Sequence, residues 1–219
     1  RSWVVLSGIH AENHFRMNFE QLLELTRLAS MRAKQLCPRA STLIEITCPW
    51  GEYYALNPYT INPYLYADMV AQIGINFDAF ALDLRTGAAR QGNYTRDFFQ
   101  ISSQVDRYAV LGKPLHLFTC APSASEPVGS AEDETGAGYW VSKWSPETQA
   151  RWMRKFYKMG LSKPVVESIT WTTLSDAHPG AIPHAGLFTG EWTSKPAFAA
   201  MRDLQRGLTQ AKPSVKTDF

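Results

Sequence analysis

Acidic residues that follow apolar, strand-like runs are the groups in this 219-residue sequence best suited to chemistry. Glu12 follows the run that begins at Trp3, and Glu52 follows the run that begins at Ser41. Where parallel strands are each followed by a helix, their downstream ends meet at one face of the sheet. We therefore expect the two carboxyl groups to lie within about 10 Å, one as acid and the other as base for a water.

Each of these carboxylates also has a plainer interpretation. Glu12 could be a solvated loop carboxylate or a cap at the entry of a helix. Glu52 lies between Trp50 and Tyr53, whose rings would raise its pKa by desolvation, but it could equally make a hydrogen bond that holds its loop. The sequence leaves these alternatives open.

Polar residues near the same strand ends are candidate substrate contacts. His10 and Asn13 are suited to pair with hydroxyl groups. Asp83 and Arg85 occupy alternate positions of a strand and so face the same side, where they either bind substrate or form a salt bridge at the mouth of the fold. Other acidic residues lie inside strands, away from their ends, and are predicted to hold the interior or the bottom of the fold together: Glu45, Asp78 and Glu167.

Cysteine and histidine patterns do not indicate a metal or a cofactor. Cys37, Cys48 and Cys120 show no C-x-x-C or Cys/His spacing, so no zinc site or disulfide framework is predicted, although one disulfide pair stays open. Cys120 at a strand end is a possible thiolate nucleophile, with an inert buried thiol as the alternative. Asp176, His178 and His184 lack tight ligand spacing, so we predict no metal.

Composition limits the classes of partner. The formal net charge is +2 and the basic residues are scattered, which disfavours nucleic acid and anionic membranes. No apolar run approaches a membrane span, and no basic and apolar leader precedes Arg1. Aromatic residues make up 12% of the chain, and their flat faces suit sugar rings as well as cores and interfaces.

Five strand-then-helix units predict a parallel sheet in an α/β fold. Neither a phosphate loop nor a G-x-G-x-x-G motif is present, so a (β/α)8 TIM barrel is preferred over a doubly wound sheet. A complete barrel takes about 250 residues. Either further units lie on another segment, or the sheet is open and its edges need covering. We expect one partial barrel domain over 1–219, with a frayed tail over 209–219. The expected strands are 3–9, 41–47, 75–85, 113–119 and 163–171, and the expected helices begin near Asn18, Asn62, Arg96, Ser145 and Lys195.

Several motifs resemble family 10 glycoside hydrolases, the xylanase-type barrels of clan A. The resemblance runs from Trp3 to about Leu208 and corresponds to the fourth through eighth strands of that barrel. The motifs that carry it are Phe77-Asp78-Ala79-Phe80-Ala81-Leu82, Leu111-Gly112-Lys113-Pro114-Leu115-His116-Leu117-Phe118-Thr119, Ser145-Pro146-Glu147-Thr148-Gln149-Ala150, Ile169-Thr170-Trp171 with Asp176, and Gly186-Leu187-Phe188 with Lys195-Pro196-Ala197-Phe198.

The resemblance implies substrate-binding roles but does not supply the usual catalytic pair. By analogy with the family, Trp171 is a stacking floor for sugar, with a core tryptophan as the alternative, and Trp50 and Asp176 join the expected substrate contacts. The family's general acid/base glutamate is matched by Gly8, and its nucleophile position is matched by Cys120 after Thr119. Both carboxylates expected from the family are therefore displaced or absent.

Three functions remain open from the sequence. The first is a glycosidase of divergent mechanism that acts on a β-linked plant polysaccharide such as xylan. The second is a glycan-binding barrel that has lost its catalytic pair, and the third is a barrel fragment completed by another chain or a copy of itself. The expected ligand is an oligo- or polysaccharide, and the resemblance implies a secreted or periplasmic location.

Overall fold

Five strands form one parallel sheet in the order β1-β2-β3-β4-β7. The computed structural model describes residues 1–88, 92–125, 138–178 and 180–210. The strands of this sheet are β1 (Ser2–Ser7), β2 (Ser41–Ile46), β3 (Ala79–Asp83), β4 (Leu115–Thr119) and β7 (Val166–Trp171). Neighbouring strands are connected through helices, so the chain supplies consecutive βα units of a partial (β/α)8 barrel, as the sequence predicts.

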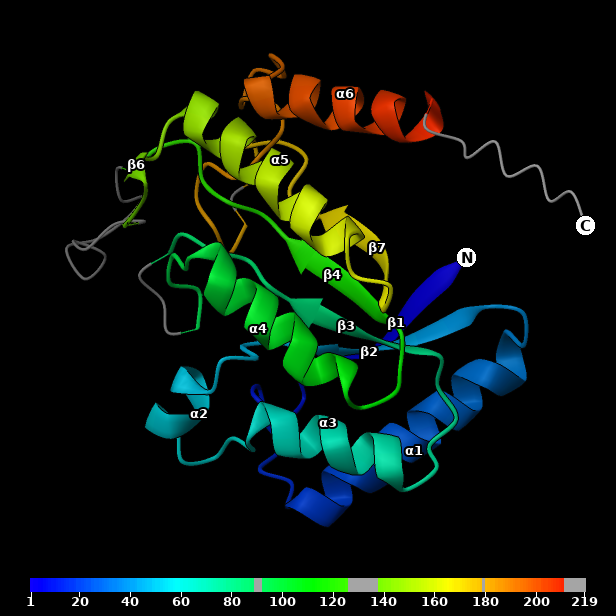
Figure 1. Ribbon diagram of the computed structural model, residues 1–219. Coiled ribbons are helices and arrows are strands. Elements are labelled where there is room, and N and C mark those ends of the chain that lie inside the picture. Colours follow the sequence, from blue (N-terminus) through cyan, green and yellow to red (C-terminus); the bar gives the residue numbers. More distant parts are fainter. Residues whose placement is uncertain (89–91, 126–137, 179, 211–219) are drawn as a thin grey trace, which may run out of the picture.

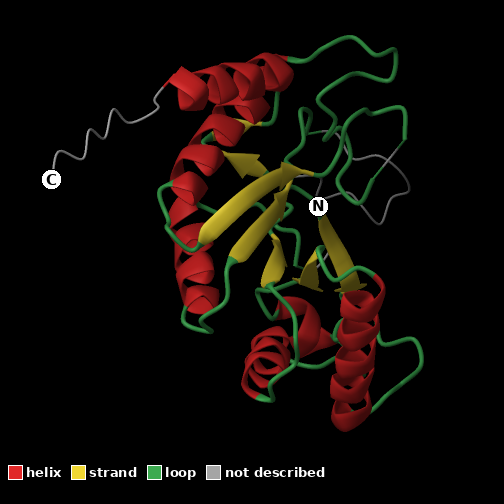
Figure 2. Ribbon diagram, turned by 90° about the vertical axis from the view of Figure 1, so that its right-hand side faces the viewer, coloured by secondary structure: helices red, strands yellow, loops and turns green. Residues whose placement is uncertain are grey.

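The helices cover one side of this curved sheet (Figures 1 and 2). Apolar side chains of β2, β3 and β4, such as Ile46, Leu82 and Leu117, form one buried core together with apolar side chains of the helices. No helix among the described residues is long and apolar enough to cross a membrane. The helices are α1 (Phe19–Leu36), α2 (Glu52–Leu56), α3 (Pro63–Gln72), α4 (Phe98–Ala109), α5 (Pro146–Leu161) and α6 (Pro196–Gln210).

The helix starts follow from local capping. The Asn18 side chain accepts from the backbone N–H of Gln21, whose side chain accepts in return from the backbone of Asn18, which is the capping box predicted from the sequence. Asn62 caps α3 ahead of a first-turn proline, and Ser145 caps α5 in the same way. Helix α4 begins later than predicted because Asp97 forms its own capping box with Gln100.

The opposite, concave face of the sheet carries small and polar side chains. Leu43, Ala79 and Ala81 form a small buried cluster there, against which Phe118 packs. Because successive residues of a strand alternate between faces, Glu45 and Asp83 lie on this same face, further along β2 and β3. The concave face therefore carries the ionisable groups while the convex face carries the main core.

Three parts of the chain differ from the sequence prediction or lie beyond its test. The short helix α2 and the hairpin of β5 (Tyr139–Trp140) and β6 (Ser142–Lys143) were not predicted. Much of the predicted long loop, 126–137, lies outside the described residues. Helix α6 includes residues 209 and 210 of the tail predicted to fray over 209–219, and residues 211–219 lie outside the described part.

Close contact between α5 and the sheet requires glycine at position 160. A Cβ at Gly160 would stand 2.6 Å from Cδ1 of Ile169 and 3.2 Å from Cδ1 of Leu117. Gly160→Val is therefore expected to lower the free energy of unfolding by about 1–3 kcal/mol through overpacking. Urea denaturation measures this change.

Gly207 in α6 provides a matched control. A Cβ there would meet nothing within 4 Å, so Gly207→Ala should raise stability by up to about 1 kcal/mol through helix propensity alone. Equal effects of the two substitutions would contradict the packing of α5 on β4 and β7.

Candidate active site

A narrow hollow lies where β1, β2 and β3 end. Its volume is about 30 Å³, room for a water molecule but not for a sugar ring. Glu12, Asp83 and Arg85 line it, together with Tyr53 from α2 and Ala181 from the loop after β7. The structure thus brings together one predicted catalytic residue and two predicted substrate-binding residues.

Glu45 belongs to the same cluster, although the sequence predicted a purely structural role for it. Burial raises the pKa of its carboxyl above the ordinary value, and the nearby charges of Asp83 and Glu12 raise it further. A hydrogen bond from Ser7 and the charge of Arg85 act in the opposite direction. The result is a half-buried carboxyl that holds its proton more tightly than usual, next to other carboxylates.

Asp83 and Arg85 form the salt bridge that the sequence offered as one alternative. The guanidinium Nε donates to Asp83 Oδ1 at 2.7 Å, and its Nη2 donates to Oδ2 in a two-pronged contact. This hydrogen bonding is the main cause of the raised pKa of Arg85. The salt bridge therefore fixes the Asp83 side chain at the wall of the narrow hollow.

A left-handed turn at Gly8 brings Glu12 back to the end of β1. Gly8 has φ of 58°, and a Cβ there would stand 2.6 Å from Oγ1 of Thr47, so only glycine fits without strain. Its carbonyl accepts from the N–H groups of Ala11 at 2.9 Å and Glu12 at 2.8 Å. Glycine at the position matched to the family's catalytic glutamate thus positions another glutamate.

Glu52, the second predicted catalytic residue, is held by a cation. It is the first residue of α2, and Nη2 of Arg96 donates to its carboxylate. The guanidinium of Arg96 also lies 4.1 Å from the ring centroid of Trp50. These contacts favour the alternative in which Glu52 holds its loop, and they cover one face of the predicted substrate-binding ring of Trp50.

His10 and Asn13, the two residues predicted to pair with hydroxyl groups, both make contacts within the protein. His10 is 1% exposed, its ring stacks on Tyr66, and Nε2 lies 3.0 Å from the carbonyl of Thr47. Burial lowers its pKa to about 4. Asn13 donates to the carbonyl of Met17 at 2.7 Å and accepts from the Met17 N–H at 2.9 Å, so its amide closes a loop. The burial of His10 favours a structural role, and its predicted contact with a sugar hydroxyl stays a prediction.

Cys120 and Trp171 lie at the downstream ends of β4 and β7 and pack in one cluster. Cys120 is fully buried, and burial raises the pKa of its thiol to about 11, which supports the inert alternative over a nucleophile. It packs with Ile182, Ala185 and Trp171, whose indole N–H donates to the carbonyl of Ala185 at 2.9 Å. Trp171 is partly buried, and these contacts favour the alternative of a core tryptophan over a stacking floor. The described cysteines are free thiols.

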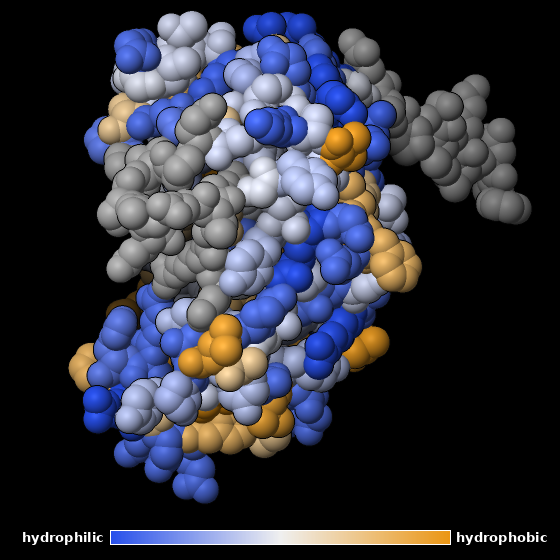
Figure 3. All heavy atoms as spheres, turned by 90° about the vertical axis from the view of Figure 1, so that its left-hand side faces the viewer, coloured by the Kyte–Doolittle hydropathy of each residue, from blue (hydrophilic) through white to orange (hydrophobic). Residues whose placement is uncertain are grey.

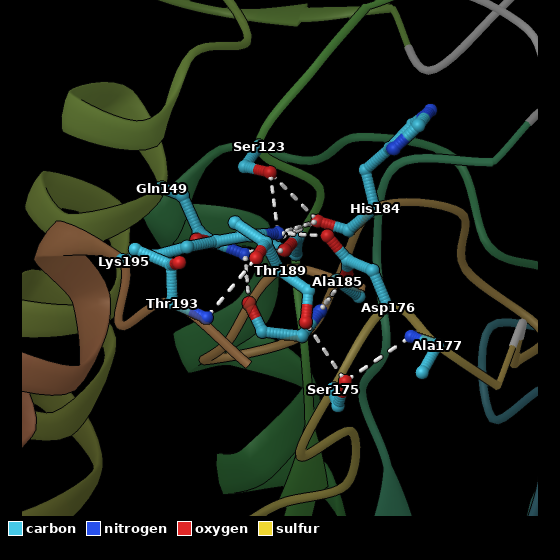
Figure 4. Close-up of polar contacts among 12 residues, drawn as sticks. Ser123, Gln149, Ser175, Asp176, Ala177, His184, Ala185, Thr189, Thr193 and Lys195 are labelled. Carbon is cyan, nitrogen blue, oxygen red and sulfur yellow. Dashed lines mark hydrogen bonds and ion pairs between the residues drawn. The ribbon is translucent and has the colours of Figure 1, made fainter. Parts of the chain in front are cut away.

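Asp176, another predicted substrate contact, is the partner of a buried lysine (Figure 4). Lys195 is 6% exposed and donates to the Asp176 carboxylate, to Oγ of Ser123 at 2.8 Å and to the carbonyl of His184 at 3.2 Å. The second oxygen of Asp176 accepts from the N–H of Gly186 at 2.7 Å. This network fixes the loop after β7, whose Ala181 walls the narrow hollow.

Among the described residues no cluster of three or more His, Cys, Asp and Glu side chains could hold a metal ion.

The sequence carried no signal for Glu45, because its position inside a strand resembles that of many structural residues. It also indicated no role for Lys195, because its partner Asp176 lies 19 positions earlier in the chain.

Comparison with known proteins supports the fold. The sequence matches no protein-family model and no curated protein. Among solved structures, xylanase 10B from Thermotoga maritima has 17% identity and a TM-score of 0.56, over 85% of this chain and 53% of that chain. The GH2 beta-galacturonidase from Eisenbergiella tayi has 12% identity and a TM-score of 0.57, over 94% of this chain and 33% of that chain. This chain has the TIM-barrel-like fold of glycoside hydrolases.

The fold likeness is broader than the resemblance seen in the sequence. A beta-glucuronidase from Lactobacillus rhamnosus matches as well as the xylanase, with a TM-score of 0.56 at 12% identity over 94% of this chain and 32% of that chain. The chain spans about half the length of the xylanase and about a third of the length of the galacturonidase and of the glucuronidase. The comparison therefore supports the glycoside hydrolase barrel fold without selecting family 10.

The buried pair of Lys195 and Asp176 yields a stability prediction. Lys195→Met leaves the Asp176 carboxylate without its cation, so we expect a loss of about 3–5 kcal/mol in the free energy of unfolding. Chemical denaturation followed by tryptophan fluorescence measures it. The double variant Lys195→Met, Asp176→Asn removes the stranded charge, keeps the contact with Gly186, and should recover part of the loss. A single-variant loss below about 1 kcal/mol would show that the pair is not the anchor of this loop.

Proposed function

We propose that this protein is a glycoside hydrolase that acts on a β-linked plant polysaccharide such as xylan through a divergent carboxylate mechanism. The observation that carries the proposal is the raised pKa of Glu45 beside the carboxylates of Glu12 and Asp83. Glycoside hydrolysis needs one protonated and one ionised carboxyl at the scissile bond. Carboxyl groups whose environments separate their pKa values are the usual way to supply them.

Roles for the individual groups follow from their contacts. Glu45 is assigned as the proton donor, because burial raises the pKa of its carboxyl. Glu12 acts as the base for a water, and the narrow hollow beside it has room for one water molecule. The two-pronged bond from Arg85 fixes the position of the Asp83 carboxyl. The charge of Asp83 raises the pKa of Glu45, whose proton goes to the leaving oxygen.

Glu52 has a supporting role in this proposal. The sequence pairs it with Glu12 as acid and base, but its contact with Arg96 favours a part in positioning α2 and Tyr53. One carboxylate oxygen of Glu52 is buried without a hydrogen-bond partner among the described residues, so a Glu52 variant is included in the activity test below. A secreted or periplasmic location is proposed on the same resemblance to polysaccharide-degrading enzymes.

A glycan-binding protein without turnover is the second candidate. Gly8 and Cys120 at the positions matched to the family's catalytic glutamates favour it, as do the ion pairs that hold Asp83 and Glu52. Completion of the barrel by another chain has less support. It rests on the outer strand β1, where Trp3 is 57% exposed.

Substitution of the proton donor tests the enzymatic function. Glu45→Gln is expected to lower kcat about 10²- to 10⁴-fold, because it removes general acid catalysis. In the wild type, activity should fall as pH rises through the raised pKa of Glu45, and this limb of the pH profile should vanish in the variant. Reducing-sugar release from a panel of xylans and β-glucans is the measurement.

Stability supplies the control for that experiment. Because the pKa of Glu45 is higher in the folded protein than in the unfolded chain, its protonation stabilises the fold. This contribution is fully present below the unfolded-chain pKa and is lost as pH rises through the folded-state pKa. Glu45→Gln should therefore be no less stable than the wild type at pH 7, so lost activity would not reflect unfolding. Glu12→Gln should lose activity to a similar extent, and Glu52→Gln much less. No release of sugar by the wild type, with retained binding of a polysaccharide, would favour the binding protein.

A further inference from the structure

A second, larger hollow adjoins the narrow one. It has a volume of about 440 Å³ and lies between the loop after β1 and the segment from α2 to α3. Ala11, Glu12 and Tyr53 line both hollows, so the two adjoin and Glu12 belongs to the wall that they share. Its volume is in the range of sites that bind small molecules.

The walls of the larger hollow are tied together before any ligand binds. Asn13 donates to the carbonyl of Met17 at 2.7 Å, and the N–H of Ile61 donates to the carbonyl of His10 at 2.8 Å, which joins the loop after β1 to the segment ahead of α3. Asn57 donates to the carbonyl of Tyr53 at 2.7 Å. A ligand would therefore lose little affinity to ordering of the loops.

The lining combines aromatic rings with hydrogen-bonding groups. Tyr59 is 63% exposed, and the guanidinium of Arg16 lies 4.9 Å from its ring centroid, which stiffens a ring that stays open to solvent. Tyr53, Glu12 and His14 supply further polar atoms along the lining. On the face of the molecule that includes α2, hydrophobic side chains show as small separate groups among hydrophilic ones (Figure 3). This mixture suits a polar ligand with flat apolar faces, such as a pyranose ring.

We propose that the larger hollow is a saccharide subsite in which Tyr59 is the stacking platform, so that the ligand is an uncharged sugar chain and not a single sugar. The inference rests on the proposed function and deepens it. Because the narrow hollow has room only for a water, the sugar residues lie in the larger one, with a glycosidic bond next to Glu12. A chain of more than one residue fills more of the 440 Å³ than a monosaccharide does.

Binding of oligosaccharides of increasing length tests the subsite. Titration calorimetry is carried out on the full chain with xylose and glucose and with their β-1,4-linked oligomers up to the hexasaccharide. For the wild type, affinity should rise with chain length until the hollow is filled. Tyr59→Ala should weaken binding of the longer oligomers about tenfold, and Tyr59→Phe should bind like the wild type because the ring is kept.

Tyr54 offers a matched control on the same segment. It is an exposed tyrosine that does not line the hollow, so Tyr54→Ala should bind like the wild type. Affinity independent of chain length, or equal effects of Tyr59→Ala and Tyr54→Ala, would overturn the subsite. The subsite would also be overturned if Tyr59→Ala left binding unchanged while its circular dichroism showed a native fold. Absence of binding by every saccharide in the series, with the wild type folded, would overturn the proposed function itself.

Discussion

The register of the parallel pairing of β1, β2 and β3 at their downstream ends is the constraint on which the rest of the structure depends. Ser7 pairs with Glu45 across β1 and β2, and Glu45 pairs with Ala81 across β2 and β3. Asp83 lies two positions beyond Ala81, so it faces the same side as Glu45. A slip of one residue would turn Glu45 or Asp83 toward the helices and bury a carboxylate in the apolar core. The cost of that burial ties the chemistry of the concave face to the packing of the convex face.

Much of the fold could be predicted from local signals. Asn18 and Gln21, Asn62 and Pro63, and Ser145 and Pro146 mark helix starts through contacts a few residues apart, so the sequence pattern alone identifies them. The alternation that places Asp83 and Arg85 on one side is equally local. Helix α2 is short and starts after a left-handed Gly51, so neither periodicity nor a side-chain cap announces it.

The site was predicted less completely because its interactions join residues far apart in sequence. Arg96 takes Glu52 into an ion pair across 44 positions, and Lys195 holds Asp176 from the start of the next helix. No local pattern shows which cation will reach a given carboxylate. Glu45 was missed for a related reason: position inside a strand suggests structure, whereas its significance depends on charges brought in by β1 and β3.

The acidic side chains of the site differ in their surroundings: three form ion pairs, whereas Glu45 is shifted toward its protonated form. Asp83, Glu52 and Asp176 each have a cationic partner, while Glu45 is pushed toward its protonated form by burial. The low identities to the solved structures leave the chemistry of this chain to be argued from its own side chains.

The most direct test of this account is the pKa of the Glu45 carboxyl, measured by ¹³C NMR titration of the folded protein and assigned with Glu45→Gln. The account predicts a pKa of Glu45 above the ordinary value of about 4.3. In Glu12→Gln this pKa should fall, because the negative charge of Glu12 is removed. An ordinary pKa for Glu45 that does not respond to Glu12→Gln would contradict the convergence of these carboxyl groups.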